Sequence, residues 1–217
     1  MKFLNRTFLK LILCLSLVLT LFTGCARETT AQGELPRFKF QRKQLESVTM
    51  AAQEADFTEL EDCINLKQLD LTGSTCYDQI LNYIRNHPNV DVVYEAPLGD
   101  LMLSNSETEA ALEPGTYDLD SLLRQLHYLP NLTSLTLPKT TLTAEELSAL
   151  ADPFPELQVA YSIDLPGKEY LSDTTSADFS NVSAAEMEQI TEKFSMLPKL
   201  TEVTLPSALR MEEVKSL

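Results

Sequence analysis

Few side chains in this sequence have the types and the spacing that catalysis or metal binding requires. Both histidines, His87 and His127, lack a cysteine or carboxylate at a spacing typical of metal ligands. Glu59, Glu61 and Asp62 lie close together and could bind calcium, but no Asp-x-Asp-x-Asp-Gly run is present, so a solvated acidic face is the better interpretation. The motifs of metalloproteases, serine hydrolases, phosphate-binding loops and Cys-x-x-Cys sites are also missing from the sequence. We therefore expect a non-catalytic protein without a metal site or a cofactor.

Cys25 is the residue whose surroundings most clearly predict a chemical reaction. Three basic residues precede an apolar run at residues 11–22, which is too short to span a bilayer and is typical of a secretory signal. Residues 21–25 (LFTGC) resemble the lipobox of bacterial lipoproteins, except that Phe22 replaces the usual leucine. The resemblance implies a lipoprotein signal peptide at residues 1–25 and acylation of Cys25 as the new N-terminus. It also implies that lipid holds the protein on the extracellular face of the cell membrane; an ordinary secretory signal with a chance cysteine is the alternative.

The chain that follows is strongly acidic. All 32 acidic residues come after Cys25, against 17 basic residues in the whole sequence, and the net charge is −15. Such a surface repels nucleic acid and anionic lipid, so we expect no nucleic-acid partner. Arg37, Lys39, Arg42 and Lys43 are a local exception near the anchor; they could contact anionic headgroups or be solvated charges on a first strand.

Cys63 and Cys76 are the other two cysteines of the mature chain. An extracellular compartment permits a disulfide between them, but the distance that separates them in space does not follow from the sequence. The alternative is a pair of free thiols, with Cys63 as a small core residue.

The chain contains two families of repeated segments. One family has the pattern Leu-x-x-Leu-x-Leu or a close variant, and its members start 66 and then 68 residues apart, at 66–71, 132–137 and 200–205. The other pairs residues 88–98 with residues 155–165, at an offset of 67 residues. Along both kinds of segment apolar residues alternate with a period of two, which predicts strands.

Helices are predicted between these strands. Capping-box patterns begin at Thr143 and Ser183, each with a glutamate three residues later, and apolar stripes of helical spacing cover residues 77–84, 119–129 and 187–197. Strands that alternate with single helices favour parallel pairing, with the helices packed on one face. We therefore predict an α/β fold built from units of about 67 residues.

A Leu-x-x-Leu-x-Leu strand that follows a helix resembles the leucine-rich repeat. The resemblance covers residues 48–217 and implies a solenoid of parallel strands with helices on one face. It departs from the family in two respects, because the unit is longer than the usual ~20–29 residues and because Gly73, Lys139 and Ser207 replace the asparagine that usually follows the strand. The chain is similar to the divergent leucine-rich-repeat surface lipoproteins of clostridia-like Gram-positive bacteria.

The expected organisation has three parts. Residues 1–25 are the signal peptide, residues 26–47 a polar tether and N-terminal cap, and residues 48–217 the solenoid, in which residues 99–116 are a long loop or an irregular crossover. Residues 211–217 begin a helix after which a further strand should follow, so we expect the solenoid to be truncated at its C-terminus.

A leucine-rich array can bind a partner without any catalytic residue. The residues between the strand leucines face outward together, and we expect them to lie side by side as a polar, threonine-rich surface that hydrogen-bonds an unknown protein or a glycan. The candidate binding residues are Lys67, Gln68, Asp70, Thr133, Ser134, Thr136, Thr201, Glu202 and Thr204. The alternative is that the repeats form the anchored N-terminal region of an envelope enzyme whose catalytic domain is missing.

Overall fold

A computed structural model describes residues 29–115 and 117–207 of this chain. Cys25, the rest of the expected signal peptide and the expected final helix at 211–217 lie outside the described residues. The chain divides after Tyr94 into two compact units, which we call unit 1 and unit 2 and describe one at a time. Both units combine parallel sheet pairing with helices, so the fold is mixed α/β.

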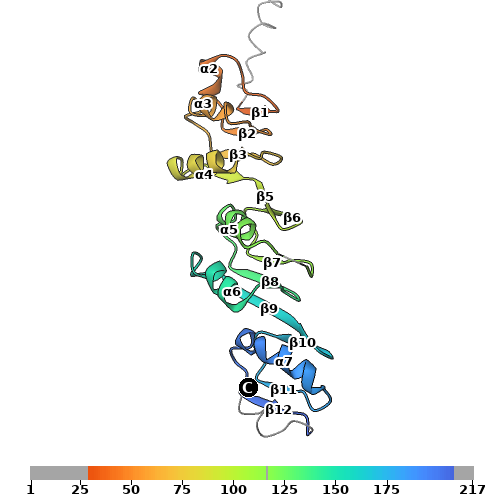
Figure 1. The fold of residues 1–217 in the computed structure, drawn as a ribbon. Coiled ribbons are helices and arrows are strands. Elements are labelled where there is room, and N and C mark those ends of the chain that lie inside the picture. The colour runs from red at the N-terminus through yellow and green to blue at the C-terminus, as the bar shows by residue number, and fades with distance from the viewer. Residues whose placement is uncertain (1–28, 116, 208–217) are drawn as a thin grey trace, which may run out of the picture. The chain divides into compact units, whose positions relative to one another are not determined.

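Unit 1 contains one sheet of four parallel strands, in the order β1-β2-β3-β4. The strands are β1 (Thr30–Gln32), β2 (Ser47–Thr49), β3 (Gln68–Asp70) and β4 (Asp91–Val93). The connecting helices are α2 (Lys39–Arg42), α3 (Asp56–Leu60) and α4 (Tyr77–Asn86), and Figure 1 shows them on the same side of the strands. Because β1 and α2 lie inside residues 26–47, the sheet begins earlier than the expected start of the repeats at residue 48.

An apolar row across the strands holds this sheet on its core. Val48, Leu69 and Val92 are partners in the strand register, and they are 1%, 1% and 7% exposed. Each is the middle residue of a three-residue strand, so its two neighbours point to the opposite face. Burying a side chain of this size contributes roughly 1.5–3 kcal/mol. The period-two alternation seen in the sequence is therefore the physical basis of the sheet.

Unit 2 contains a four-stranded sheet in the order β10-β9-β8-β7 and two smaller sheets. The four strands are β7 (Glu109–Ala111), β8 (Ser134–Leu137), β9 (Gln158–Leu165) and β10 (Lys168–Leu171). The smaller sheets pair β5 (Glu95–Leu98) with β6 (Leu101–Ser104) and β11 (Ser176–Asp178) with β12 (Glu202–Thr204). The helices are α5 (Leu119–His127), α6 (Ala144–Ala151), α7 (Ala184–Glu192) and the short 3-10 helix η1 (Phe194–Met196). Figure 1 shows α5 and α6 on the same side of strands β7 to β9.

Two antiparallel hairpins correct the expectation that all strands pair in parallel. β5 pairs with β6, and the end of β9 pairs with β10, in both cases through a connection of two residues. Such a short connection permits only antiparallel pairing, and each contains a glycine with positive φ, Gly99 at 58° and Gly167 at 88°. The segment 99–116 is therefore not an irregular crossover, because β6 and β7 lie within it.

The hairpins repeat with the period found in the sequence. Leu98 pairs with Leu101 in the first hairpin, and Leu165 pairs with Lys168 in the second, so each partner recurs 67 positions later. The strand that follows each hairpin starts at Glu109 or at Ser176, again at this offset. Between two strands at the 67-residue offset the chain therefore places further strands, which decides which side chains become neighbours.

The predicted helix starts in unit 2 are confirmed. Thr143 Oγ1 accepts a hydrogen bond from the Glu146 backbone N–H, and Glu146 Oε2 accepts one from the Thr143 backbone N–H. Ser183 caps α7 through the same reciprocal arrangement. At the start of α5 the carboxylate of Asp118 accepts a hydrogen bond from the backbone N–H of Ser121 at 2.9 Å. These caps satisfy helix N–H groups that have no partner within the helix.

Candidate binding surface

The outward side chains of the sheet in unit 1 form two rows. One row pairs Ser47, Gln68 and Asp91, and the other pairs Thr49, Asp70 and Val93. Five of these six side chains are polar, and Val93 is 43% exposed although apolar. Because parallel register puts these side chains next to one another, the rows form a continuous outward face.

The sheet in unit 2 has corresponding outward rows. One row pairs Glu109, Ser134 and Gln158, and the other pairs Ala111, Thr136 and Ala160. The buried row between them contains Leu135, which is fully buried, and Val159. The second outward row is short in its side chains, so it leaves space above the sheet.

The nine predicted binding residues are not side by side, which corrects our expectation. Gln68 and Asp70 lie on β3 in unit 1, Ser134 and Thr136 on β8, and Glu202 and Thr204 on β12, and these three strands belong to three different sheets. The reason is that strands at the 67-residue offset are separated by other strands. β2 and β4 are the neighbours of β3, and β7 and β9 are the neighbours of β8.

Lys67, Thr133 and Thr201 precede their strands and make contacts within the protein. Thr133 Oγ1 donates a hydrogen bond to the Thr108 carbonyl at 3.2 Å, and Thr201 Oγ1 donates one to the Thr175 carbonyl at 3.1 Å. Each bond reaches back to the residue that precedes the neighbouring strand. Lys67 does the same through its side chain, since its Nζ lies 2.9 Å from Oε2 of Glu46. These three residues therefore connect adjacent strands.

A groove lies over the outward face of unit 2, and it is the predicted face's clearest concavity. It has a volume of about 570 Å³, and Thr136, Gln158 and Ala160 from the outward rows contribute to its lining. Leu171 of β10, whose side chain is 59% exposed, and the exposed Lys199 complete its apolar and basic parts. We call this feature the β8–β10 groove. Of the nine predicted residues, Thr136 alone is part of its lining.

A polar cluster borders the β8–β10 groove. Lys139 Nζ lies 3.2 Å from Asp164 Oδ2 and 4.0 Å from Glu169 Oε2. Ser162 is 3% exposed, accepts a hydrogen bond from the Lys139 backbone N–H at 2.8 Å, and donates one to Glu169. The cluster holds the turn after β8, where Lys139 has a φ of 48°, against the hairpin that forms the groove wall. Lys139 thus occupies the position of the family's asparagine and also contacts the next strand along the sheet.

Sequence reasoning missed most residues of this groove. Gln158 and Ala160 lie on β9, whose apolar alternation was visible, so their outward direction could have been inferred from it. Leu171 and Lys199 gave no such signal, because one is in a hairpin strand and the other comes from a loop 28 residues later in the chain.

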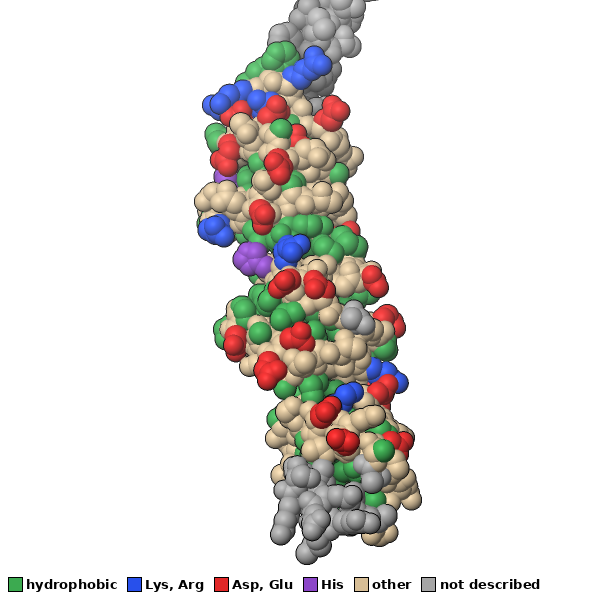
Figure 2. Space-filling model, in the orientation of Figure 1, with side chains coloured by type: hydrophobic (Ala, Val, Ile, Leu, Met, Phe, Trp, Pro, Cys, Tyr) green, Lys and Arg blue, Asp and Glu red, His purple; other side chains and the backbone are tan. Residues whose placement is uncertain are grey.

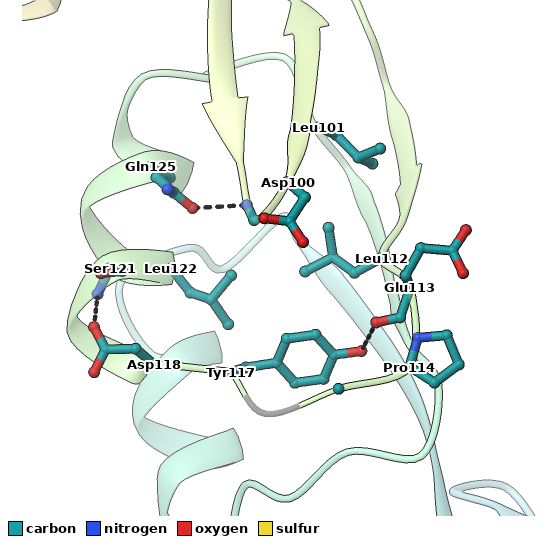
Figure 3. A pocket seen from close by; sticks show the side chains of 12 residues that line it. Asp100, Leu101, Leu112, Glu113, Pro114, Tyr117, Asp118, Ser121, Leu122 and Gln125 are labelled. Carbon is teal, nitrogen blue, oxygen red and sulfur yellow. Dashed lines mark hydrogen bonds between the residues drawn. The ribbon is translucent and has the colours of Figure 1, made fainter.

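A second pocket, of about 300 Å³, lies between α5 and the hairpin β5–β6 (Figure 3). Its polar groups have structural partners. Gln125 Oε1 accepts a hydrogen bond from the Gly99 backbone N–H at 2.9 Å, the Tyr117 hydroxyl donates one to the Glu113 carbonyl at 2.7 Å, and Asp118 caps α5. These bonds hold the pocket wall together, so this pocket is a weaker candidate than the β8–β10 groove.

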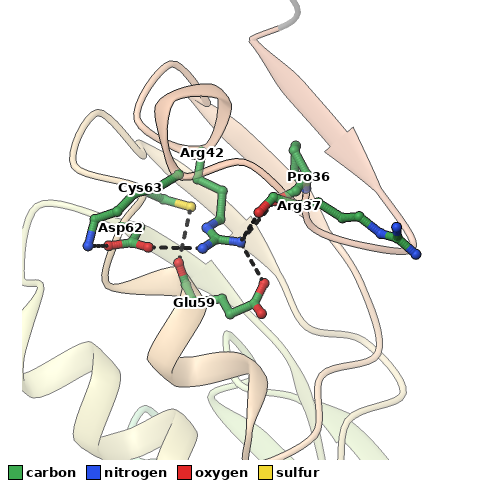
Figure 4. A network of polar contacts seen from close by, with 7 residues as sticks. Pro36, Arg37, Arg42, Glu59, Asp62 and Cys63 are labelled. Carbon is green, nitrogen blue, oxygen red and sulfur yellow. Dashed lines mark hydrogen bonds and ion pairs between the residues drawn. The ribbon is translucent and has the colours of Figure 1, made fainter.

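In unit 1, Arg42 is the centre of a polar network (Figure 4). Its guanidinium donates hydrogen bonds to the Pro36 carbonyl at 2.9 Å, to Glu59 Oε2 at 2.9 Å and to Asp62 Oδ2 at 3.1 Å. Lys39 Nζ lies 2.6 Å from the other oxygen of Asp62. The hydrogen bonds from Lys39 and Arg42 lower the pKa of the Asp62 carboxyl below its usual value.

This network revises two interpretations made from the sequence. Lys39 and Arg42 belong to a helix rather than to a first strand, and both are bonded to carboxylates of the same unit. Glu59 and Asp62 are therefore partners in ion pairs rather than a purely solvated acidic face, and Glu61 Oε2 lies 3.3 Å from Nε2 of His87.

The two cysteines in unit 1 are free thiols, so the disulfide alternative is wrong. Cys63 is 4% exposed, and burial raises the pKa of its thiol to about 11. Cys76 is half-buried, and burial raises the pKa of its thiol as well. Within residues 29–115 and 117–207 no group of three or more His, Cys, Asp or Glu side chains is placed to hold a metal ion. In the same part of the chain no helix has the length and apolar character needed to cross a bilayer.

No protein-family model, curated protein or solved structure matches this chain. Its function must therefore be argued from the sequence and from the geometry above.

Proposed function

We propose that this chain is an extracellular lipoprotein, anchored to the cell membrane through an acylated Cys25, that binds a protein or glycan partner and is not catalytic. In this proposal its body is a leucine-rich-repeat-like solenoid of 67-residue units, and the β8–β10 groove is the main contact surface. The lipobox-like residues 21–25 support the anchor.

Strand spacing and side-chain contacts support the solenoid. Strands β2, β3 and β4 start at residues 47, 68 and 91, and β7, β8 and β9 start at 109, 134 and 158, so one coil takes roughly the 20–29 residues of a leucine-rich repeat. Asn65 Nδ2 donates a hydrogen bond to the Lys43 carbonyl at 2.6 Å, and Asn131 Nδ2 donates one to the Asn105 carbonyl at 2.7 Å. Each bond ties one coil to the preceding one, which is the role of the asparagine in the repeat family.

The position of the β8–β10 groove carries the binding proposal. It lies on the outward strand face, where a repeat array would contact a partner, and it combines an exposed leucine, an exposed lysine and small side chains. A groove with apolar and hydrogen-bonding groups suits an extended segment of a protein or a glycan better than a flat surface does. Lys199 adds the positive charge that an acidic protein otherwise lacks at this face.

Charge placed in the groove tests this proposal. Ala160 and Gln158 are exposed on β9, so an Ala160→Arg or a Gln158→Arg variant should fold normally and fill the groove. Ser148→Arg, on the exposed side of α6, adds the same charge away from the strand face and is the matched control. Envelope partners that copurify with the anchored protein should decrease at least about tenfold for the groove variants and remain unchanged for the control, a loss of about 1.4 kcal/mol or more in binding. Equal recovery with all three variants would show that the groove is not the contact surface.

A further inference from the structure

Two aromatic side chains at one end of unit 1 are exposed to solvent. Phe38 and Phe40 are each 63% exposed, and their rings stack with centroids 5.8 Å apart. They belong to the loop and helix that follow β1, which is an edge strand of the sheet. Figure 2 shows hydrophobic and basic side chains together at this end of unit 1. Burying two neighbouring phenylalanines elsewhere in the core would have been favourable, so their exposure needs an explanation.

The charge around these rings is the reverse of that of the whole protein. Residues 37–43 contain four basic residues and no acidic one, whereas the net charge of the chain is −15. Lys39 and Arg42 are bonded to carboxylates, as described above. Arg37 and Lys43 are exposed, and no carboxylate of the described residues forms an ion pair with either. Two free cations therefore flank a stacked aromatic pair.

The proposed anchor restricts where this end of unit 1 can be. Cys25 precedes the first described residue, Thr29, by four residues, and an extended chain spans at most ~3.6 Å per residue, so a lipid on Cys25 keeps Thr29 within about 14 Å of the bilayer surface. Thr29 is adjacent to β1, and its carbonyl accepts hydrogen bonds from the backbone N–H groups of Glu46 and Ser47. The aromatic pair lies on the same terminal coil of the unit.

We infer that Phe38, Phe40, Arg37 and Lys43 form a membrane-contact surface that takes anionic phospholipid headgroups and the outermost part of their acyl chains. This inference rests on the proposed lipid anchor. Aromatic rings are favoured at the boundary between headgroups and acyl chains, and cations beside them attract anionic lipid. Because acyl chains already supply stable attachment, the patch adds a second contact that sets how unit 1 is oriented on the membrane.

A tryptophan reporter can measure this contact, since the chain contains no tryptophan. We would prepare the acylated full chain as a Phe40→Trp variant, and as a Val93→Trp variant for control, and reconstitute each into vesicles of phosphatidylcholine and phosphatidylglycerol with brominated acyl chains. Val93 is exposed on β4, the opposite edge of the same sheet, three strand spacings or about 14 Å from β1. We expect bromine to quench the fluorescence of the Phe40→Trp variant several-fold more than that of the control. Adding Arg37→Glu and Lys43→Glu should remove most of the difference.

The outcomes separate the inference from the anchor. If the protein carries its acyl mass and cosediments with vesicles, but the two reporters are quenched equally, the membrane-contact surface is wrong and the anchor stands. If the Phe40→Trp reporter is shielded only as protein concentration rises, the surface joins two copies of the chain instead, which also overturns the inference. If the mature protein has no acyl mass on Cys25, the proposed anchor fails and the inference fails with it.

Discussion

Replacing Arg42 should destabilise unit 1 more than any exposed ion pair does. The Arg42 side chain is 12% exposed and connects the segment before α2 to the end of α3. An Arg42→Met variant keeps much of the aliphatic packing but removes the guanidinium. The carbonyls of Pro36 and Arg37 then lose a donor, and two carboxylates lose their cation.

The size of the effect follows from these contacts. Hydrogen bonds to charged groups contribute about 1.5–3 kcal/mol each when buried, and those in contact with solvent contribute less. Glu59 is half exposed, so its bond adds little, and the loss for Arg42→Met should be about 3 kcal/mol in total. Arg42→Lys should lose about half as much, because an ammonium reaches one carboxylate but cannot reproduce the planar fork.

Urea unfolding followed by far-ultraviolet circular dichroism measures the change. With a slope of about 1.5 kcal/mol per M, Arg42→Met should lower the midpoint of unit 1 by about 2 M. Lys67→Met is the matched control, because the pair of Lys67 with Glu46 is 69% and 49% exposed and should contribute less than about 1 kcal/mol. If both variants shift the midpoint equally, Arg42 does not hold the terminal coil and the reasoning is wrong.

Three further predictions concern single contacts. Asn131→Ala removes the hydrogen bond to the Asn105 carbonyl, so we expect a loss of about 1 kcal/mol in urea unfolding, and an unchanged midpoint would contradict the coil-to-coil role. The hydrogen bonds from the Ser121 side chain and backbone lower the pKa of the Asp118 carboxyl, so this carboxylate stabilises the fold above its ordinary pKa and stops doing so as the pH falls through the lower folded value; Asp118→Asn should flatten the decrease in melting temperature between about pH 5 and pH 3, and parallel curves would refute this. In native protein at about pH 8, a maleimide should modify Cys63 at least about tenfold more slowly than the more exposed Cys76, and equal rates would mean that Cys63 is accessible.

Local patterns in the sequence predicted a part of the fold well. Leu69 and Leu135 sit in alternating segments and are buried in β3 and β8, and the reciprocal caps at Thr143 and Ser183 start α6 and α7 as expected. In each case the determining interactions lie within a few residues or within one strand. Such interactions are recorded in residue order and can be read from it.

The parts that were missed depend on residues distant in the sequence. β1 has the sequence Thr-Ala-Gln, which carries no apolar alternation, and it forms because it completes the register of β2. The β8–β10 groove needs Thr136, Leu171 and Lys199 to meet, and only the order of strands in the sheet brings them together. The 67-residue repeat was visible, but the number of strands inside each unit was not, so equivalent strands were wrongly expected to be neighbours.

The central claim, that the outward strand face of an anchored protein binds a partner through the β8–β10 groove, is tested most directly by photo-cross-linking in intact cells. A photoreactive amino acid in place of Ala160 would lie within the groove, and the same amino acid in place of Ser148 would lie on the helix side of unit 2. We predict one discrete cross-linked product from position 160 that is absent from position 148 and is lost when Gln158→Arg is added. The same products from both positions, or none from position 160, would contradict the proposed function.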